Sequence, residues 1–138
     1  MPEESTTPDL GELVRRAVEA LNRRDVDAAI APFSRDGVWD MLGVGVFTGH
    51  EAMRGFFEDW IGAYEDYEIE MEEHIDFGND VTFSVFLQRG RPRGSTGWVQ
   101  VRYRVVSTWV DGLIQRATNY PDIDEARAAA ERLAEERG

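Results

Sequence analysis

The chain has 138 residues, a net charge of −12, 42% hydrophobic residues and no cysteine. This length suits one domain with a proper core, and the lack of cysteine excludes disulfides, thiolate nucleophiles and cysteine-based zinc sites. All fifteen basic residues are arginine, which excludes lysine Schiff bases, and the acidic surface disfavours nucleic acid and anionic membranes as partners.

The first residues, Met1–Thr7, are acidic and polar. They contain no apolar stretch, so the sequence predicts no signal peptide. No apolar run approaches the roughly 18 residues that a membrane-spanning helix needs. We therefore expect a cytoplasmic protein with a single domain over residues 1–138 and a core at about 9–134.

Helical periodicity dominates the first half of the chain. The first helix is expected to begin near Pro8, a residue favoured at the first helical position. Asp25 is the expected N-cap of a second, shorter helix. Thr48 and Glu51 have capping-box spacing and mark the expected start of a third helix. The apolar faces of these helices are formed by Leu10, Leu13, Val14, Ala17, Val18 and Leu21, then Val26, Ala29, Ile30 and Phe33, then Met53, Phe56, Phe57, Trp60, Ile61 and Tyr64.

From Tyr67 the hydrophobic period changes to two, which is typical of strands with one buried face. An Asp-Gly pair near residue 111 is a strong hairpin signal. The expected strands span 38–42, 67–77, 81–89, 98–110 and 113–120, with turns at 34–37, 78–80, 90–97 and 111–112.

The last predicted element is an alanine-rich helix, where Asp122 and Glu125 repeat the capping spacing. We expect this helix to be short and to pack lightly. Helices followed by strands and one last helix favour an α+β fold over a parallel βαβ sheet. The predicted architecture is a cone, in which a strongly curved antiparallel sheet wraps around the N-terminal helices and leaves a pocket for a small molecule.

Strict alternation in the strand at 67–77 puts Glu73 on the apolar face, where a carboxylate needs a partner or a proton. A β-bulge at Glu72 and Glu73 would instead turn this side chain outward. The same alternation places His74 on the solvated face, and His50 falls in the first turn of the third helix. Neither histidine has a second ligand at metal-binding spacing, so we predict no metal site and no cofactor.

The segments LNRRDVDAAIAPFSRDGVWD, FTGHEAMRGFFEDW and VDGLIQRATNYPDIDEARAAAERLA resemble the SnoaL-like family of the nuclear transport factor 2-like superfamily. The resemblance covers roughly residues 9–134 and implies the cone fold and a homodimer. This superfamily holds isomerases, dehydratases, polyketide cyclases, epoxide hydrolases and members that only bind. The fold alone does not choose among them.

The resemblance makes Asp40 the candidate general acid or base, because ketosteroid isomerase-like members place a proton-shuttling aspartate on this strand. Inside an apolar cone, desolvation would disfavour the charged carboxylate and make it a better base. Those members also use a tyrosine on the first helix and an acid late in the sheet. The matching positions here are Ala17 and the stretch Val105–Ser107, which supply neither group.

The epoxide hydrolase-like members resemble this chain in ATNYPD, but the aspartate that they need is Asn119 here. Their Arg-x-Asp pair has no match around Val81–Val85. Asn119 can still orient a ligand, because an amide both donates and accepts hydrogen bonds.

Trp60, Tyr64, Glu73, Tyr103 and Asn119 are thus the candidate ligand-binding residues. A role in the core or at the surface is the alternative for each of them. The hydroxyl of Tyr103, on the apolar face of a central strand, needs a partner that a ligand could supply.

Two function classes stay open. The first is a small isomerase, cyclase or hydrolase that acts on a hydrophobic, polyketide- or terpenoid-like molecule, with Asp40 as general acid or base. The second is a non-catalytic ligand-binding or assembly domain with the same pocket.

Two surface features complete the prediction. The arginines between Arg89 and Arg104 form either a solvated sheet face or an anion-binding patch. Phe86, Trp98 and Val106 are expected on the less buried face of the sheet, where exposed apolar area would support a homodimer.

Overall fold

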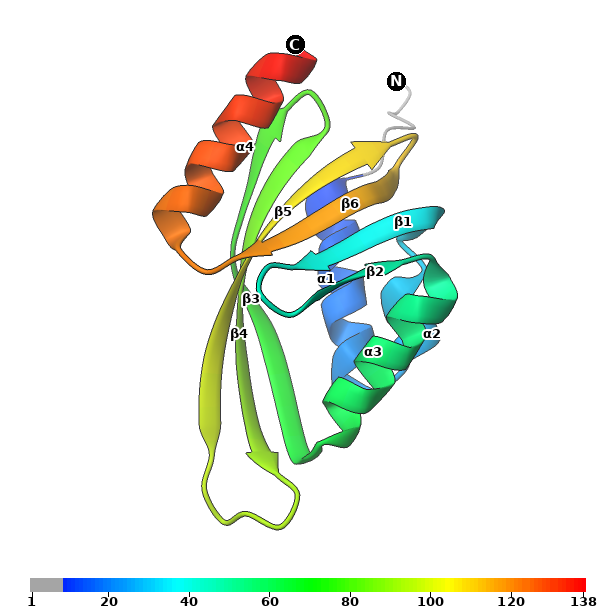
Figure 1. Cartoon of the computed structure of the whole chain (residues 1–138), viewed down its shortest axis with the longest axis vertical. Coiled ribbons are helices and arrows are strands. Elements are labelled where there is room, and N and C mark those ends of the chain that lie inside the picture. The colour runs from blue at the N-terminus through cyan, green and yellow to red at the C-terminus, as the bar shows by residue number, and fades with distance from the viewer. Residues whose placement is uncertain (1–8) are drawn as a thin grey trace, which may run out of the picture.

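The computed structural model describes residues 9–138, which form a six-stranded curved sheet and four helices (Figure 1). The helices are α1 (Leu10–Asn22), α2 (Val26–Ile30), α3 (His50–Gly62) and α4 (Ile123–Arg137). The strands are β1 (Phe33–Met41), β2 (Gly45–Thr48), β3 (Tyr64–Gly78), β4 (Val81–Pro92), β5 (Val99–Val110) and β6 (Leu113–Tyr120). The predictions on Met1–Thr7 and Pro8 concern residues outside the described range.

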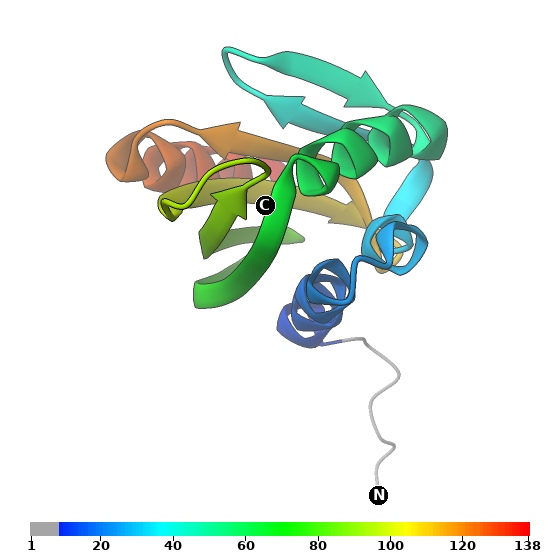
Figure 2. The ribbon, with the colours of Figure 1, turned by 90° about the horizontal axis from the view of Figure 1, so that it is seen from below.

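The strands lie in the order β2-β1-β6-β5-β4-β3. Neighbouring strands are antiparallel except for β1 and β6, which are parallel. Seen from below, the sheet bends around the space in which α1, α2 and α3 lie (Figure 2). The predicted α+β cone is therefore confirmed.

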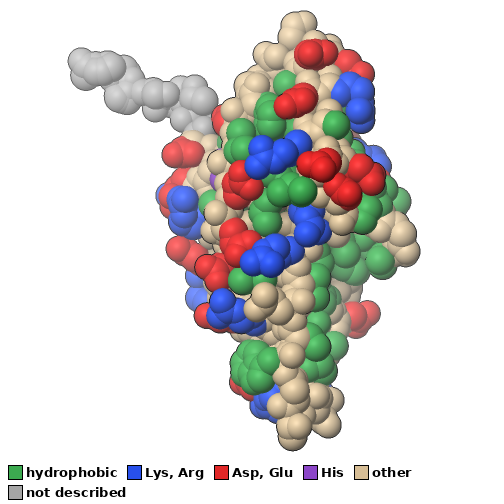
Figure 3. All heavy atoms as spheres, turned by 90° about the vertical axis from the view of Figure 1, so that its left-hand side faces the viewer, with side chains coloured by type: hydrophobic (Ala, Val, Ile, Leu, Met, Phe, Trp, Pro, Cys, Tyr) green, Lys and Arg blue, Asp and Glu red, His purple; other side chains and the backbone are tan. Residues whose placement is uncertain are grey.

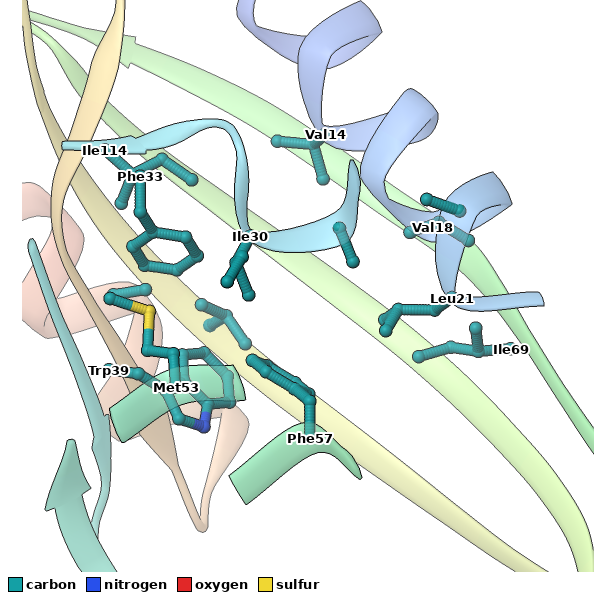
Figure 4. Close-up of a cluster of buried hydrophobic side chains, with 14 of the residues drawn as sticks. Val14, Val18, Leu21, Ile30, Phe33, Trp39, Met53, Phe57, Ile69 and Ile114 are labelled. Carbon is teal, nitrogen blue, oxygen red and sulfur yellow. The ribbon is translucent and has the colours of Figure 1, made fainter. Parts of the chain in front are cut away.

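The helices α1, α2 and α3 pack on the inner side of this curve. Asp9 caps α1 by accepting a hydrogen bond from the backbone N–H of Glu12 at 3.3 Å. Asp25 caps α2, as predicted, by accepting from the N–H of Ala28 at 3.1 Å. The apolar stripe of α1 faces the side chains of α2, α3 and β1 across the core (Figure 4).

The start of α3 differs from the prediction. Thr48 is the last residue of β2, a strand that the sequence did not suggest, and it makes no cap. The N-cap is Gly49, whose φ of 89° lies in the region that favours glycine. The chain thus turns from β2 into α3 because glycine can adopt this φ, and no capping box forms. At the other end α3 stops at Gly62, so Tyr64 belongs to β3.

A β-bulge divides β3 into two parts. Met71 pairs with Phe86 and Glu73 pairs with Val85, so Glu72 is an extra residue in the ladder. After the bulge the alternation is reversed. Ile75 packs on the side of α4, while His74 faces the inner side, half-buried, instead of the solvent as predicted.

The helix α4 covers the outer side of β4 and β5 over a second hydrophobic cluster. Ala126 and Ala130 are fully buried, because alanine lets a helix approach a sheet closely. The prediction that this helix packs lightly is therefore wrong. No helix among residues 9–138 is long and apolar enough to cross a bilayer.

Candidate functional site

A cavity of about 100 Å³ lies between the inner face of the sheet and the helices α1 and α3. We call it the central cavity. Val14 and Val18 of α1 and Phe57 of α3 are among the aliphatic and aromatic side chains that form most of its wall. Figure 4 shows these three side chains converging from the two helices. The polar groups of the described lining residues are the hydroxyls of Ser84, Tyr103 and Ser107 and the indole N–H groups of Trp39 and Trp60. The indole N–H of Trp39 is buried without a hydrogen-bond partner among residues 9–138.

Three aromatic rings in contact with one another form part of the wall of the central cavity. The ring of Trp60 stacks on Phe57 at 5.6 Å and meets Tyr103 edge to face at 5.2 Å. Both Trp60 and Tyr103 line the cavity, so two of the candidate ligand-binding residues lie where a ligand could touch them. That they bind a ligand stays a prediction.

The hydroxyl of Tyr103 has a partner inside the protein. It donates to the side-chain carbonyl of Gln88 at 3.2 Å, and the amide of Gln88 donates to the hydroxyl of Tyr64 at 3.1 Å. Gln88 is fully buried. Tyr103 therefore does not need a ligand to satisfy its hydroxyl, and Tyr64 lies behind the wall rather than in it. Burial raises the pKa of the Tyr103 phenol above its ordinary range, which keeps the group neutral.

Asp40 lies on the other side of the sheet. Its neighbour Trp39 and the adjacent β6 residue Ala117 both line the central cavity, and side chains alternate between the two faces of a strand. The carboxylate of Asp40 instead pairs with the guanidinium of Arg116 at 2.5 Å. The prediction that Asp40 faces the pocket is therefore wrong, because Trp39 takes the inward position.

Glu73 and Asn119 also lie outside the wall of the cavity. The bulge in β3 turns Glu73 toward α4, where it pairs with Arg127 at 2.8 Å. The amide oxygen of Asn119 accepts from the backbone N–H of Arg104 at 2.9 Å. Both side chains thus have partners within the fold, and neither reaches the cavity.

Ser84 and Ser107 were not predicted as site residues, and neither was Gln88 behind the wall. All three lie in strands that the sequence did predict, at 81–89 and 98–110. The apolar side chains of Val81 and Phe83 in β4 lie on the outer side, where α4 covers them. The more hydrophobic face of β4 is thus not the face that lines the cavity. Both faces are buried, so hydrophobicity does not identify the inward one.

His74 stands directly behind Ser84. Its Nδ1 lies 2.9 Å from the hydroxyl oxygen of Ser84, and its Nε2 is buried without a hydrogen-bond partner among residues 9–138. Loss of solvation lowers the pKa of His74, although Asp76 and Asp9 oppose this shift. The imidazole is therefore held in its neutral form.

The arginines between Arg89 and Arg104 do not form a free cationic patch. Arg89 lies 3.6 Å from Glu68, Arg91 lies 2.6 Å from Asp66, and Arg102 lies 2.8 Å from Glu72. Acidic and basic side chains accordingly alternate over much of the face in Figure 3. Acids of β3 thus neutralise this stretch, which favours the solvated-face interpretation.

The apolar surface predicted for a homodimer is not formed as expected. Val106 is buried under α4, and Phe86 lines the central cavity. Trp98, in contrast, is 59% exposed. Two of the three residues are therefore covered by the chain itself, and dimerisation stays a prediction.

A model of the SnoaL-like domain matches residues 14–117 of this chain. Among solved structures, a nuclear transport factor 2-like protein of unknown function from Burkholderia pseudomallei is 18% identical with a TM-score of 0.72, and the match covers 90% of this chain and 98% of that one. A hypothetical protein with a ketosteroid isomerase-like fold from Catenulispora acidiphila, in complex with trimethylamine, is 18% identical with a TM-score of 0.69, covering 91% and 94%.

Rv0760c from Mycobacterium tuberculosis, in complex with estradiol-17β-hemisuccinate, is also similar. It is 18% identical with a TM-score of 0.70, and the match covers 83% of this chain and 95% of that one. At this identity the three structures establish a shared fold and nothing further. A search of curated proteins gives no match.

Proposed function

The chain belongs to the SnoaL-like domain family, and we propose that it binds an apolar molecule of about single-ring size in the central cavity. The observation that carries this proposal is an unfilled apolar space in the core. Protein interiors are close-packed, so a void with an almost wholly apolar wall is a place where an apolar ligand gains contacts that the fold leaves unmade.

The volume limits the size of the ligand. An engineered apolar cavity of about 150 Å³ in another protein stays dry and binds benzene. The central cavity measures about 100 Å³, so one ring is the upper limit unless side chains move. The similar structures with bound small molecules support a binding role, but a steroid derivative like that in Rv0760c would require Trp60 and its neighbours to give way.

The composition of the wall favours binding over turnover. General acid–base catalysis needs a titratable group within hydrogen-bond reach of the reacting proton. Among the described residues that line the cavity there is no aspartate, glutamate or histidine. The one phenol in the wall, Tyr103, donates its hydrogen to Gln88, and burial raises its pKa. Asp40, the acid or base that the family resemblance suggests, lies on the opposite face of the sheet. Of the two function classes, the geometry supports the non-catalytic one.

The proposal is tested by filling the cavity. Benzene, toluene and cyclohexanone should each raise the melting temperature of the wild-type protein and shift the indole N–H signals of Trp39 and Trp60 in NMR spectra. Ala17→Leu places a larger side chain into the cavity from α1 and should abolish these shifts. Ala128→Leu, on the exposed side of α4, is the matched control and should bind as the wild type does. Equal binding by Ala17→Leu would refute the site.

A further inference from the structure

We propose that Ser84 donates a hydrogen bond into the central cavity, with His74 as its positioning residue, so that the cavity selects apolar molecules that carry one carbonyl oxygen. Ketones, quinones and esters of about single-ring size are the ligands of this class. The inference rests on the proposed function and adds to it the chemical group that the site recognises.

The position of His74 is fixed from two sides. It pairs with Ser84 in the ladder between β3 and β4, and its Nδ1 lies 2.9 Å from the Ser84 hydroxyl oxygen. On the other side the ring lies against Gly11 of α1, where even one added methyl carbon would approach its Cδ2 to 3.1 Å. The imidazole is therefore packed closely against Gly11 as well as hydrogen-bonded to Ser84.

With a carbonyl ligand in the central cavity, the hydrogen on the neutral ring belongs on Nδ1. Nε2 is buried without a partner among the described residues. Either tautomer leaves one buried donor without an acceptor among the described residues, which is Nε2–H of His74 in one case and the hydroxyl hydrogen of Ser84 in the other. Only Ser84 lines the central cavity, so a carbonyl ligand there can accept its hydrogen and favours the tautomer with the hydrogen on Nδ1. His74 then donates to the oxygen of Ser84. The hydroxyl hydrogen of Ser84 is consequently free to donate elsewhere.

The ring keeps this arrangement because it remains neutral. Desolvation lowers the pKa of His74, and the charged groups that act on it are Asp9 at the N-cap of α1, Arg15 in α1 and Asp76 in its own strand. The two carboxylates oppose the shift, and Arg15 supports it. The balance favours an uncharged imidazole at physiological pH.

The freed hydrogen of Ser84 points to a carbonyl ligand. Ser84 is 4% exposed and lies in the wall of the central cavity, and within residues 9–138 its hydroxyl has His74 as its sole side-chain partner. Tyr103 cannot take this role, because its hydrogen is already donated to Gln88. Ser107 also lines the cavity, but none of the side chains that the structure describes orients its hydroxyl, so it is less preorganised.

The first test compares two ligands of nearly the same shape, cyclohexanone and the hydrocarbon methylenecyclohexane. Their Kd values are measured from the shifts of the Trp60 indole signal in the full chain. In Ser84→Ala the Kd of the ketone should rise relative to that of the hydrocarbon by about two- to tenfold. Ser107→Ala should change this ratio less, and Ser95→Ala, in the loop after β4, should not change it.

The outcomes separate this inference from the proposed function. Binding of both ligands with a ratio that is insensitive to Ser84→Ala, or that depends on Ser107 instead, overturns the role of Ser84 and leaves the proposed function intact. Failure of the wild-type protein to bind either ligand overturns both.

The second test reads the tautomer of His74 from its ¹⁵N signals at about pH 8, where imidazoles are neutral. The chain has two histidines, and His50 is an internal standard. Nε2 of His50 lies 2.8 Å from the carbonyl oxygen of Phe33, which only accepts, so this ring carries its hydrogen on Nε2. With cyclohexanone bound, we expect the opposite tautomer for His74. A hydrogen on Nε2 of His74 would overturn the proposal, because Ser84 would then donate to His74 and could only accept from a ligand.

Discussion

The two sides of the sheet are packed in different ways. On the outer side, α4 lies close to β4 and β5, and the buried alanines of the helix leave Phe83 with no exposed area. On the inner side, the larger side chains of α1 and α3 meet the sheet around the central cavity. The strand β4 takes part in both layers. The comparison teaches that the more hydrophobic face of a strand need not face the ligand site, because a helix can cover it.

The largest difference in stability between the two sides of the sheet should appear when one phenylalanine on each side of β4 is truncated. Phe83→Ala should lower the free energy of unfolding by about 3–5 kcal/mol, because the ring is fully buried in a filled layer. Phe86→Ala should cost less, because this ring is half-buried beside an existing void. Urea unfolding of both variants measures the difference. Equal losses would mean that the inner side is as well packed as the outer.

The next largest difference in stability should appear when a larger side chain is introduced on each side of the sheet. Ala130→Leu on α4 should cost about 1–3 kcal/mol of unfolding free energy, because the added atoms have no space and must displace the helix. The same change at Ala17, in the wall of the central cavity, should be neutral or stabilising. The denaturant midpoints of the two variants measure this difference. A large loss of unfolding free energy in Ala17→Leu would show that the central cavity has no room for the added atoms.

The order of elements and the α+β class could be predicted because hydrophobic periodicity reports local structure directly. The direction of a side chain relative to the cavity could not, since it depends on the parity of each strand. A single extra residue, Glu72, reverses this parity in β3 and brings His74 to the inner side. The signal in the sequence is Glu73, a carboxylate that strict alternation would put on the apolar face. It raised a bulge at Glu72 and Glu73 as an alternative, and the structure has this bulge.

The prediction placed Asp40 on the wrong face of its strand for a related reason. Its strand offers Trp39 and Asp40 as alternative inward residues, and the resemblance to isomerases favoured the acid. The partner that holds Asp40 outside is Arg116, which is 76 positions away in the sequence. Only the parallel pairing of β1 with β6 brings the two together. The start of α3 at Gly49 was missed because a glycine can begin a helix through its φ alone.

The pH dependence of the unfolding free energy should report on the inner side of the sheet, because His74 lies there. The pKa of His74 is lowered in the folded protein, so below the ordinary value of about 6.5 the unfolded chain binds a proton that the folded ring resists. The contribution of this group is fully present above that pH and is lost as the pH falls toward the lowered pKa. His74→Gln should therefore show a smaller loss of stability between about pH 7.5 and 5.5 than the wild type. Parallel pH profiles of the two proteins would contradict this expectation.

The smallest effect is expected at the exposed end of the sheet, where charges rather than packing meet. Arg89 lies 3.6 Å from Glu68 and 3.7 Å from Glu70, and all three side chains are largely solvated. Such pairs contribute about 0–1 kcal/mol, so Arg89→Gln should change the free energy of unfolding by less than about 1 kcal/mol, and less still in high salt. Sulfate or phosphate at low ionic strength should not raise the melting temperature through these arginines. An anion effect that Arg89→Gln removes would show instead that the acids of β3 leave part of the cationic charge free to bind.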